Sequence, residues 1–266
     1  MQVHGQAEER HRAATLGRAV ARIPNGLRER IGTVIGTWWA PAISAISQFR
    51  RARMFHPRGL AFSGRSEPNI GGAFANLGAQ LEGRVLARYS GALWKQPVET
   101  FDVLGIGLRI RPGDGPDLTE HPSIDDQDLL FATIRSPLTM MLSPFTTDAH
   151  DFVTNRYWAV SPFAVHDHER VELRLVPVDP PKLAGPRDER LREAVAAGRA
   201  VWRLEARKTL SLQWHAVARI TLEHEVDIDQ EALRFDPFRV GCGVVPVGLV
   251  HSIRRAAYPA SQEGRP

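Results

Sequence analysis

Two segments with alternating apolar residues constrain the fold of this chain more than any other feature. The segments 101–111 (FDVLGIGLRIR) and 170–178 (RVELRLVPV) place an apolar side chain at every second position. Because side chains alternate between the two faces of an extended strand, each segment predicts a strand with one buried face. The inward positions are Leu104, Ile106, Leu108 and Ile110 in the first segment, and Val171, Leu173, Leu175 and, as an optional fourth, Pro177 in the second.

The rest of the chain predicts further strands with helices at both ends. Residues 53–178 have strand-like patterns, interrupted by a loop rich in Gly, Pro and Asp at 111–126. Helices are predicted over 7–50 and 185–201, a long strand over 209–226, and a short helical end after a Pro- and Gly-rich stretch at 236–248. Antiparallel strands with long loops favour a β-barrel or a strongly curved sheet in an α+β protein.

Composition indicates an ordinary globular chain. Of its 266 residues, 43% are hydrophobic and 24% are charged. The most apolar stretch, 31–49, is interrupted by Gly36 and Pro41, so we expect a packed helix there, although its spacing also suits a helix lying on a surface. Its position is too late for a signal peptide. The single cysteine, Cys242, fits a reducing compartment, and we expect a cytoplasmic protein without membrane association.

The basic residues are almost all arginines, because lysine occurs only at positions 95, 182 and 208. Arginine offers a rigid fork for carboxylates and phosphates, although the codon usage of a GC-rich genome explains the bias equally well. The arginines are scattered and are not interleaved with aromatic residues. We therefore predict no nucleic-acid groove.

Three short segments carry residues that suit chemistry. Arg53 and His56 lie three residues apart in 51–64. Arg88 and Ser90 alternate in 85–91 and therefore share a face, which we place inside the barrel, where an anionic ligand or an internal glutamate would satisfy the arginine. The third segment is the C-terminal 251–266.

In that last segment, Arg254 precedes Tyr258 by four residues, and Arg265 follows it by seven. A guanidinium beside a phenol favours the ionised form of the phenol. A phenolate is a good ligand for ferric iron. Taken alone, each of these segments is more typical of surface or structural positions than of a site.

Together, and in this order, the segments resemble the haem catalases. The family motif Arg-x-x-His-Ala-Lys-Gly is matched by Arg53, His56 and Gly59, and Ala-Arg-Phe-Ser is similar to 87–90. The motif Arg-x-x-x-Tyr-Pro, with a further arginine seven residues after the tyrosine, is reproduced without a gap by Arg254, Tyr258, Pro259 and Arg265. The segment 131–137 (FATIRSP) looks like the family strand Phe-Phe-Ile-Arg-Asp-Pro.

The resemblance covers about residues 50–180 and 230–266. It implies a catalase-like antiparallel β-barrel with flanking N- and C-terminal helices, in which 51–266 form a domain that binds haem b and 1–50 form a helical extension. It also implies roles for single residues. Tyr258 would be the proximal iron ligand, Arg254 would hold it as phenolate, His56 would be the distal acid–base and Ser90 would orient its ring. The residues implied to pair with the haem propionates are Arg53, Arg88 and Arg265.

Several positions depart from the family pattern. His56 is followed by Pro57 and Arg58 where the family has Ala-Lys. A gap-free count from 134–135 places Gln127 where catalases have a distal asparagine, and Met140 near the phenylalanine that packs on the distal face of the haem. Dismutation of peroxide requires a second peroxide held accurately, so these changes favour a peroxidase with at most weak catalase activity.

The expected function is therefore a haem-dependent peroxidase that uses hydrogen peroxide or organic hydroperoxides and a small-molecule reductant. A hydroperoxide isomerase or lyase resembling allene oxide synthase, a non-enzymatic haem-binding or storage protein, and a barrel that has lost haem are the alternatives. The sequence is compatible with a homo-oligomer.

Five other residues are interpreted as structural. His166 and His168 share a face at a spacing that metals use, but no third ligand is near them in sequence, so a solvated turn is favoured. We predict that Cys242 is a packed small residue, that His215 is a sheet residue and that His224 lies at the surface.

Overall fold

The described part of the chain consists of ten strands and three helices. The computed structural model describes residues 59–91, 99–135, 142–166 and 168–247, and within the chain Arg53–Pro246 forms one compact unit. The strands are β1 (Leu60–Pro68), β2 (Gly83–Gly91), β3 (Leu104–Pro112), β4 (Gln127–Ala132), β5 (Tyr157–Ala159), β6 (Phe163–Val165), β7 (His168–Pro177), β8 (Val201–Lys208), β9 (His215–Glu225) and β10 (Val245–Pro246). The helices are α4 (Ala75–Gln80), α5 (Ser143–Thr146) and α6 (Arg187–Ala196).

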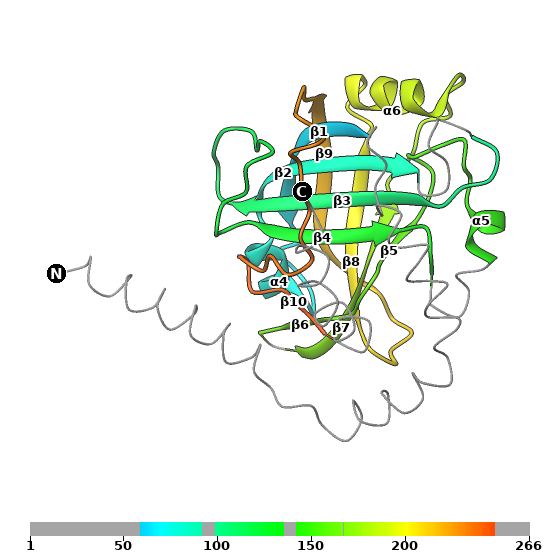
Figure 1. The fold of residues 1–266 in the computed structure, drawn as a ribbon. Helices are drawn as coiled ribbons and strands as arrows, with labels where there is room; N and C mark the ends of the chain where they lie inside the picture. Colours follow the sequence, from blue (N-terminus) through cyan, green and yellow to red (C-terminus); the bar gives the residue numbers. More distant parts are fainter. Residues whose placement is uncertain (1–58, 92–98, 136–141, 167, 248–266) are drawn as a thin grey trace, which may run out of the picture. The chain divides into compact units, whose positions relative to one another are not determined.

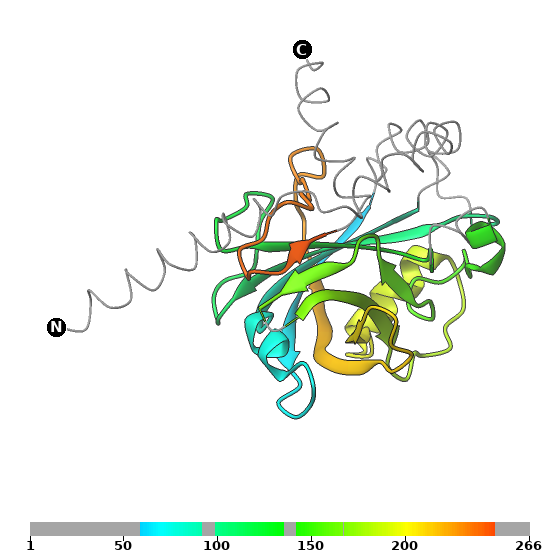
Figure 2. The same cartoon turned by 90° about the horizontal axis from the view of Figure 1, so that it is seen from below.

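Eight of these strands close into an antiparallel barrel. Neighbouring strands follow the order β7-β5-β4-β3-β2-β1-β9-β8, and β8 pairs back with β7 (Figures 1 and 2). β6 pairs with β7 outside this ring, and β10 pairs with β6. Of the two predicted alternatives, a β-barrel and a strongly curved sheet, the antiparallel barrel is therefore confirmed. The predicted terminal helices, over 7–50 and after residue 248, lie outside the described residues.

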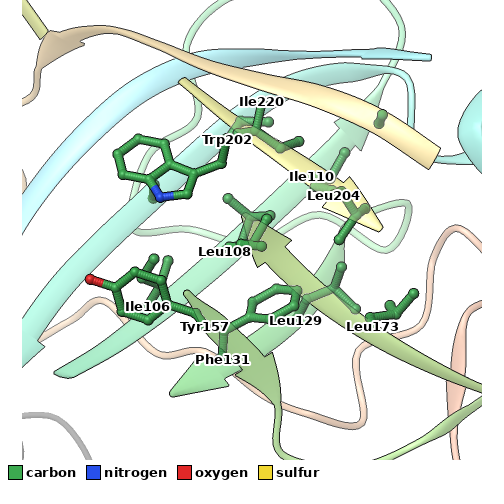
Figure 3. Packing of buried hydrophobic residues seen from close by; sticks show 14 of the residues in the cluster. Ile106, Leu108, Ile110, Leu129, Phe131, Tyr157, Leu173, Trp202, Leu204 and Ile220 are labelled. Carbon is green, nitrogen blue, oxygen red and sulfur yellow. The ribbon is translucent and has the colours of Figure 1, made fainter. Parts of the chain in front are cut away.

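The barrel interior is filled by the alternating apolar residues. Leu104, Ile106, Leu108 and Ile110 on β3 are all buried in the main core, as are Val171, Leu173 and Leu175 on β7. Figure 3 shows β3 side chains facing Leu173, Trp202, Leu204 and Ile220 from other strands of the barrel. Pro177 is only partly buried and is not part of this core. The inward positions predicted by strict alternation are thus confirmed.

The outer face of β1, β2 and β3 is also covered. Ala61, Leu86, Leu118 and Leu233 form a second, smaller apolar cluster on this face. The ring of Phe235 lies so close to Gly107 that a Cβ at Gly107 would come within 2.8 Å of it. The segment 226–240 therefore packs against the outside of the barrel on the face that includes β2, the strand that carries Arg88 and Ser90.

The helix predicted over 185–201 is observed as α6. Asp188 and Glu189 lie in its first turn, where carboxylates interact favourably with the helix dipole. Gly198 follows the C-cap with a φ of 66°, a left-handed conformation that glycine adopts without strain. No helix among the described residues is long and apolar enough to cross a membrane.

The strand predicted over 209–226 begins later than expected. β9 starts at His215, and 209–214 form the turn between β8 and β9. The amide of Thr209 donates to the carbonyl of Arg170 (3.2 Å) and that of Ser211 to the carbonyl of Lys208 (2.9 Å), which closes the turn. Leu210, Leu212 and Trp214 alternate as they would in a strand, although this segment forms a turn. The alternation therefore placed the predicted start of the strand too early. Helix α4 was not expected from the sequence.

Cys242 is 8% exposed and belongs to the main core, as predicted for a packed small residue. Burial, together with the carboxylates of Asp126 and Asp125, raises the pKa of its thiol from 9.0 to about 12. Because the native thiol titrates above the unfolded one, its contribution to stability is complete below about pH 9 and is lost as the pH rises towards about 12.

We therefore expect Cys242 to resist a thiol-specific reagent at pH 8 until the protein is unfolded, since only the thiolate reacts. Labelling rates with and without denaturant check this. Labelling of the native protein as fast as that of the unfolded protein would contradict the burial described above.

Candidate functional site

The outer face of β2 carries Arg88 and Ser90 side by side. Both are buried, and they point away from the interior, which receives Ala87 and Tyr89 from the same strand. The prediction that Arg88 and Ser90 share a face is therefore confirmed. The expectation that this face is the inner one is wrong. The apolar residues of β2 occupy the interior, so the alternation places the two polar residues outside.

The strand next to this pair presents no side chains toward it. Arg88 lies opposite Gly107 of β3, and Ser90 lies opposite Gly105. Among the described residues, the hydroxyl of Ser90 is buried and has no hydrogen-bond partner. A buried polar group without a partner is costly, so this hydroxyl suits a partner that lies beyond the described residues or a ligand.

The guanidinium of Arg88 is held from two sides. Its Nε donates to Oε1 of Gln230 over 2.7 Å, and Gly59 is so close that a Cβ there would come within 2.8 Å of the guanidinium. Burial, with the nearby charge of Arg234, lowers the pKa of Arg88 to about 10. Gln230 and Arg234 were missed by sequence reasoning, since more than 140 residues separate Arg88 from Gln230 and no local pattern joins them.

A buried ion network holds the covering segment next to this face. Arg109, which is fully buried, donates from Nε to Oδ1 of Asp128 over 2.9 Å. The other carboxylate oxygen of Asp128 accepts from Arg239 and from the amide of Asp236 (2.8 Å). Burial raises the pKa of Asp128, although both guanidiniums oppose this shift. Asp128 therefore connects the barrel wall to the segment 234–240.

Gln127 has a different environment from Arg88 and Ser90. It lies opposite Ile110, whose side chain is in the interior, whereas Ser90 faces outward. Its Nε2 donates to the carbonyls of Arg239 (3.0 Å) and Val244 (3.1 Å), and its Oε1 accepts from the amide of Val244 (3.2 Å). The structure thus gives Gln127 a bonding role in holding 239–244. This differs from the distal catalytic role that the resemblance implies, because the gap-free count carries no information about faces.

The other predicted site residues lie outside the described part of the chain. They are Arg53, His56, Met140, Arg254, Tyr258 and Arg265. Of the nine predicted residues, the structure therefore locates Arg88, Ser90 and Gln127, and it brings the first two together.

The barrel resembles a solved structure. A structure of a bacterial catalase matches with a TM-score of 0.54 and 14% sequence identity, covering 85% of this chain and 60% of the catalase chain. The barrel is catalase-like. The match spans about 60% of the length of the catalase chain. At 14% identity it shows the fold alone. No protein-family model and no curated protein matches the sequence.

Catalase-like barrels raise the question of whether the described residues fit haem, a flat group with two carboxylates. The outer face of β2 and β3 offers a fixed guanidinium at Arg88 and a buried hydroxyl at Ser90. Their neighbours across the sheet are Gly105 and Gly107 on β3 and Ala61 on β1, and the ring of Phe235 from the covering segment lies over Gly107. The ordered guanidinium of Arg88 fits a carboxylate of such a group, whereas the space over Gly107 is taken by the ring of Phe235.

Two other clusters do not form sites. Asp117 accepts from Ser63 over 2.6 Å and lies 2.7 Å from Nε2 of His224, so the aspartate, not the histidine, is in the middle. A nucleophile triad needs the histidine between the other two residues, so this cluster is an ion-pair network around Arg84. His166 lies in the turn after β6, whereas His168 is the first residue of β7 and its ring contacts Phe74. No group of three or more potential metal ligands exists among the described residues.

Proposed function

We propose that this protein is a haem-dependent peroxidase that acts on hydrogen peroxide or organic hydroperoxides, and that residues 51–266 form its haem-binding domain. The observation that carries the proposal is the outward-facing pair of Arg88, whose guanidinium is ordered, and Ser90, whose buried hydroxyl has no partner among the described residues, on a catalase-like barrel. The order of the motifs around His56 and Tyr258 supports the same conclusion.

Three arginines hold the haem carboxylates in this proposal. Arg88 is pre-organised by its bond to Gln230 and by the contact of its guanidinium with Gly59. A guanidinium that is already ordered loses little conformational entropy on binding, and its fork matches a carboxylate. Arg53 and Arg265 act in the same way. Tyr258 supplies the phenolate ligand, and the cation of Arg254 stabilises its ionised form.

When bound, haem supplies the iron at which the O–O bond of the peroxide is cleaved. The chain's own residues move the proton. The imidazole of His56 takes a proton from the peroxide oxygen and returns it to the oxygen that leaves. Ser90 orients this imidazole through its hydroxyl, whose partner is not among the described residues.

The bonding of Gln127 favours peroxidase turnover over dismutation. Its amide hydrogens and oxygen are used by the backbone of 239–244, so the amide is not available to position a second peroxide. A small-molecule reductant therefore completes the cycle. The non-enzymatic haem-binding protein and the hydroperoxide isomerase or lyase use the same haem site and are separated from the peroxidase by turnover.

The test is donor oxidation by the haem-loaded protein. Haemin is added to the purified full chain, binding is followed by the Soret absorption, and an aromatic donor and peroxide are then supplied. For His56→Ala we expect haem to be retained and turnover to fall about 100-fold or more, the scale for loss of a general acid–base.

His150→Ala is the matched control, because His150 is exposed and lies at the surface near Glu99. It should leave turnover unchanged. If His56→Ala binds haem and oxidises the donor as fast as wild type, the protein is a haem-binding protein and not a peroxidase. Failure of the wild-type chain to bind haemin would refute the proposal altogether.

A further inference from the structure

Two leucines are almost fully exposed at one turn of the barrel. Leu210 is 96% exposed and Leu212 is 91% exposed, in the turn 209–214 between β8 and β9. Ser211 separates them. This turn lies at the end of the barrel where β6 meets β7, because β8 ends where β7 begins (Figure 1). Arg88 and Ser90 lie towards the other end of the strands, since Ser90 pairs near the start of β3.

The backbone at Leu210 is strained. Its φ is 74°, and Asp179 is the only other described non-glycine residue with a positive φ. Aspartate tolerates the left-handed region, whereas a leucine there is a genuine outlier. Glycine or asparagine would make this turn with less strain. The side chain of Leu210 is 96% exposed, so packing within the described fold does not compensate for the strain.

Cationic residues surround the base of the turn. Lys208 and Arg170 are both exposed, and the carbonyl of Arg170 accepts the amide of Thr209. The guanidiniums of Arg174 and Arg207 lie 4.1 Å and 4.6 Å from the centroid of the Trp214 ring.

The two described carboxylates beside the turn, Glu205 and Glu172, are already paired. Glu205 binds Arg174 (2.6 Å) and Arg203 (2.6 Å), and Glu172 binds Arg207 (2.6 Å). Lys208 and Arg170 have no ion pair among the described residues, so the described side chains at the base of the turn keep a positive charge. An exposed apolar tip above positive charge and a tryptophan matches what the surface of an anionic bilayer binds.

We propose that the turn 209–214 docks on an anionic lipid surface, inserting Leu210 and Leu212 into it while Lys208 and Arg170 contact the headgroups. A stable protein interface buries roughly 800 Å² on each partner, far more than two leucine side chains offer. Insertion into lipid needs no such area, because each apolar group gains by leaving water independently. The docked turn leaves the Arg88 and Ser90 face free, and it revises the expectation of no membrane association.

The test is sedimentation of the purified full chain with vesicles of phosphatidylcholine alone or with added phosphatidylglycerol. We expect binding that requires phosphatidylglycerol and weakens with salt, as charge attraction does. The double variant Leu210→Asn and Leu212→Ser should bind at least about tenfold more weakly, since both insertions are lost. Its thermal stability should equal or exceed that of wild type, because asparagine tolerates the left-handed region better than leucine.

Ile124→Ser is the matched control, since Ile124 is 89% exposed in the loop 111–126. It should bind as wild type does. Equal binding by the double variant and wild type would overturn the proposal, as would the absence of wild-type binding to phosphatidylglycerol vesicles. A loss of self-association in the double variant, without a change in vesicle binding, would assign the turn to contact with a second copy and would also overturn it.

Discussion

Tyr258→Phe is expected to reduce the haem affinity of the full chain by at least about 100-fold, because the change removes the phenolate ligand. Replacing an outer-shell partner of a metal ligand already costs about 10- to 100-fold in affinity, and the ligand itself contributes more. Deleting residues 255–266 should abolish binding, since Arg265 is lost as well. Titration with haemin, followed at the Soret band, measures both effects.

Tyr157→Phe is the control for loss of a phenol. Tyr157 is buried, and its hydroxyl donates to the carbonyl of Phe152 over 2.7 Å. Removing this hydroxyl should lower the free energy of unfolding by about 1 kcal/mol and leave haem affinity unchanged. The barrel described over 59–247 ends before the deleted residues, so the truncated chain should keep its β-sheet circular dichroism. Wild-type haem affinity in Tyr258→Phe would assign the iron ligand elsewhere.

The parts of the fold that the sequence predicted well depend on local patterns. Ile106 and Leu108 on β3, like Leu173 and Leu175 on β7, lie at every second position of a single strand and are buried in the main core. A strand with one buried face must alternate, so the period itself reveals the interior set. The shared face of Arg88 and Ser90 follows from the same period. Which of the two faces points inward depends on the apolar residues of that strand, which occupy the interior.

The contacts that complete the candidate site could not be predicted, because they join distant segments. The bond from Arg88 to Gln230 and the ion pair of Asp128 with Arg239 depend on how 226–240 folds back over the barrel. The role of Gln127 depends on the same segment. A count along the chain finds its position but not the backbone groups of 239–244 that use its amide.

The ion network at Asp128 leads to the second large prediction. Asp128 is 1% exposed and accepts hydrogen bonds from Arg109, Arg239 and the amide of Asp236. Asp128→Ala leaves the fully buried Arg109 with Asp126, 3.8 Å from its Nε, as its remaining ion-pair partner. Breaking a buried pair by removing one member costs about 3–5 kcal/mol. We expect a loss of that size in the free energy of unfolding, measured by urea denaturation.

Asp114→Ala is the matched control, because Asp114 pairs with Arg65 over 3.0 Å but is 86% exposed at its side chain. It should cost about 1 kcal/mol or less, since solvent screens an exposed pair. The double variant Arg109→Met and Asp128→Leu should regain much of the loss, because it leaves no buried charge without a partner. If Asp128→Ala were no more destabilising than Asp114→Ala, the network would not hold 234–240 to the barrel.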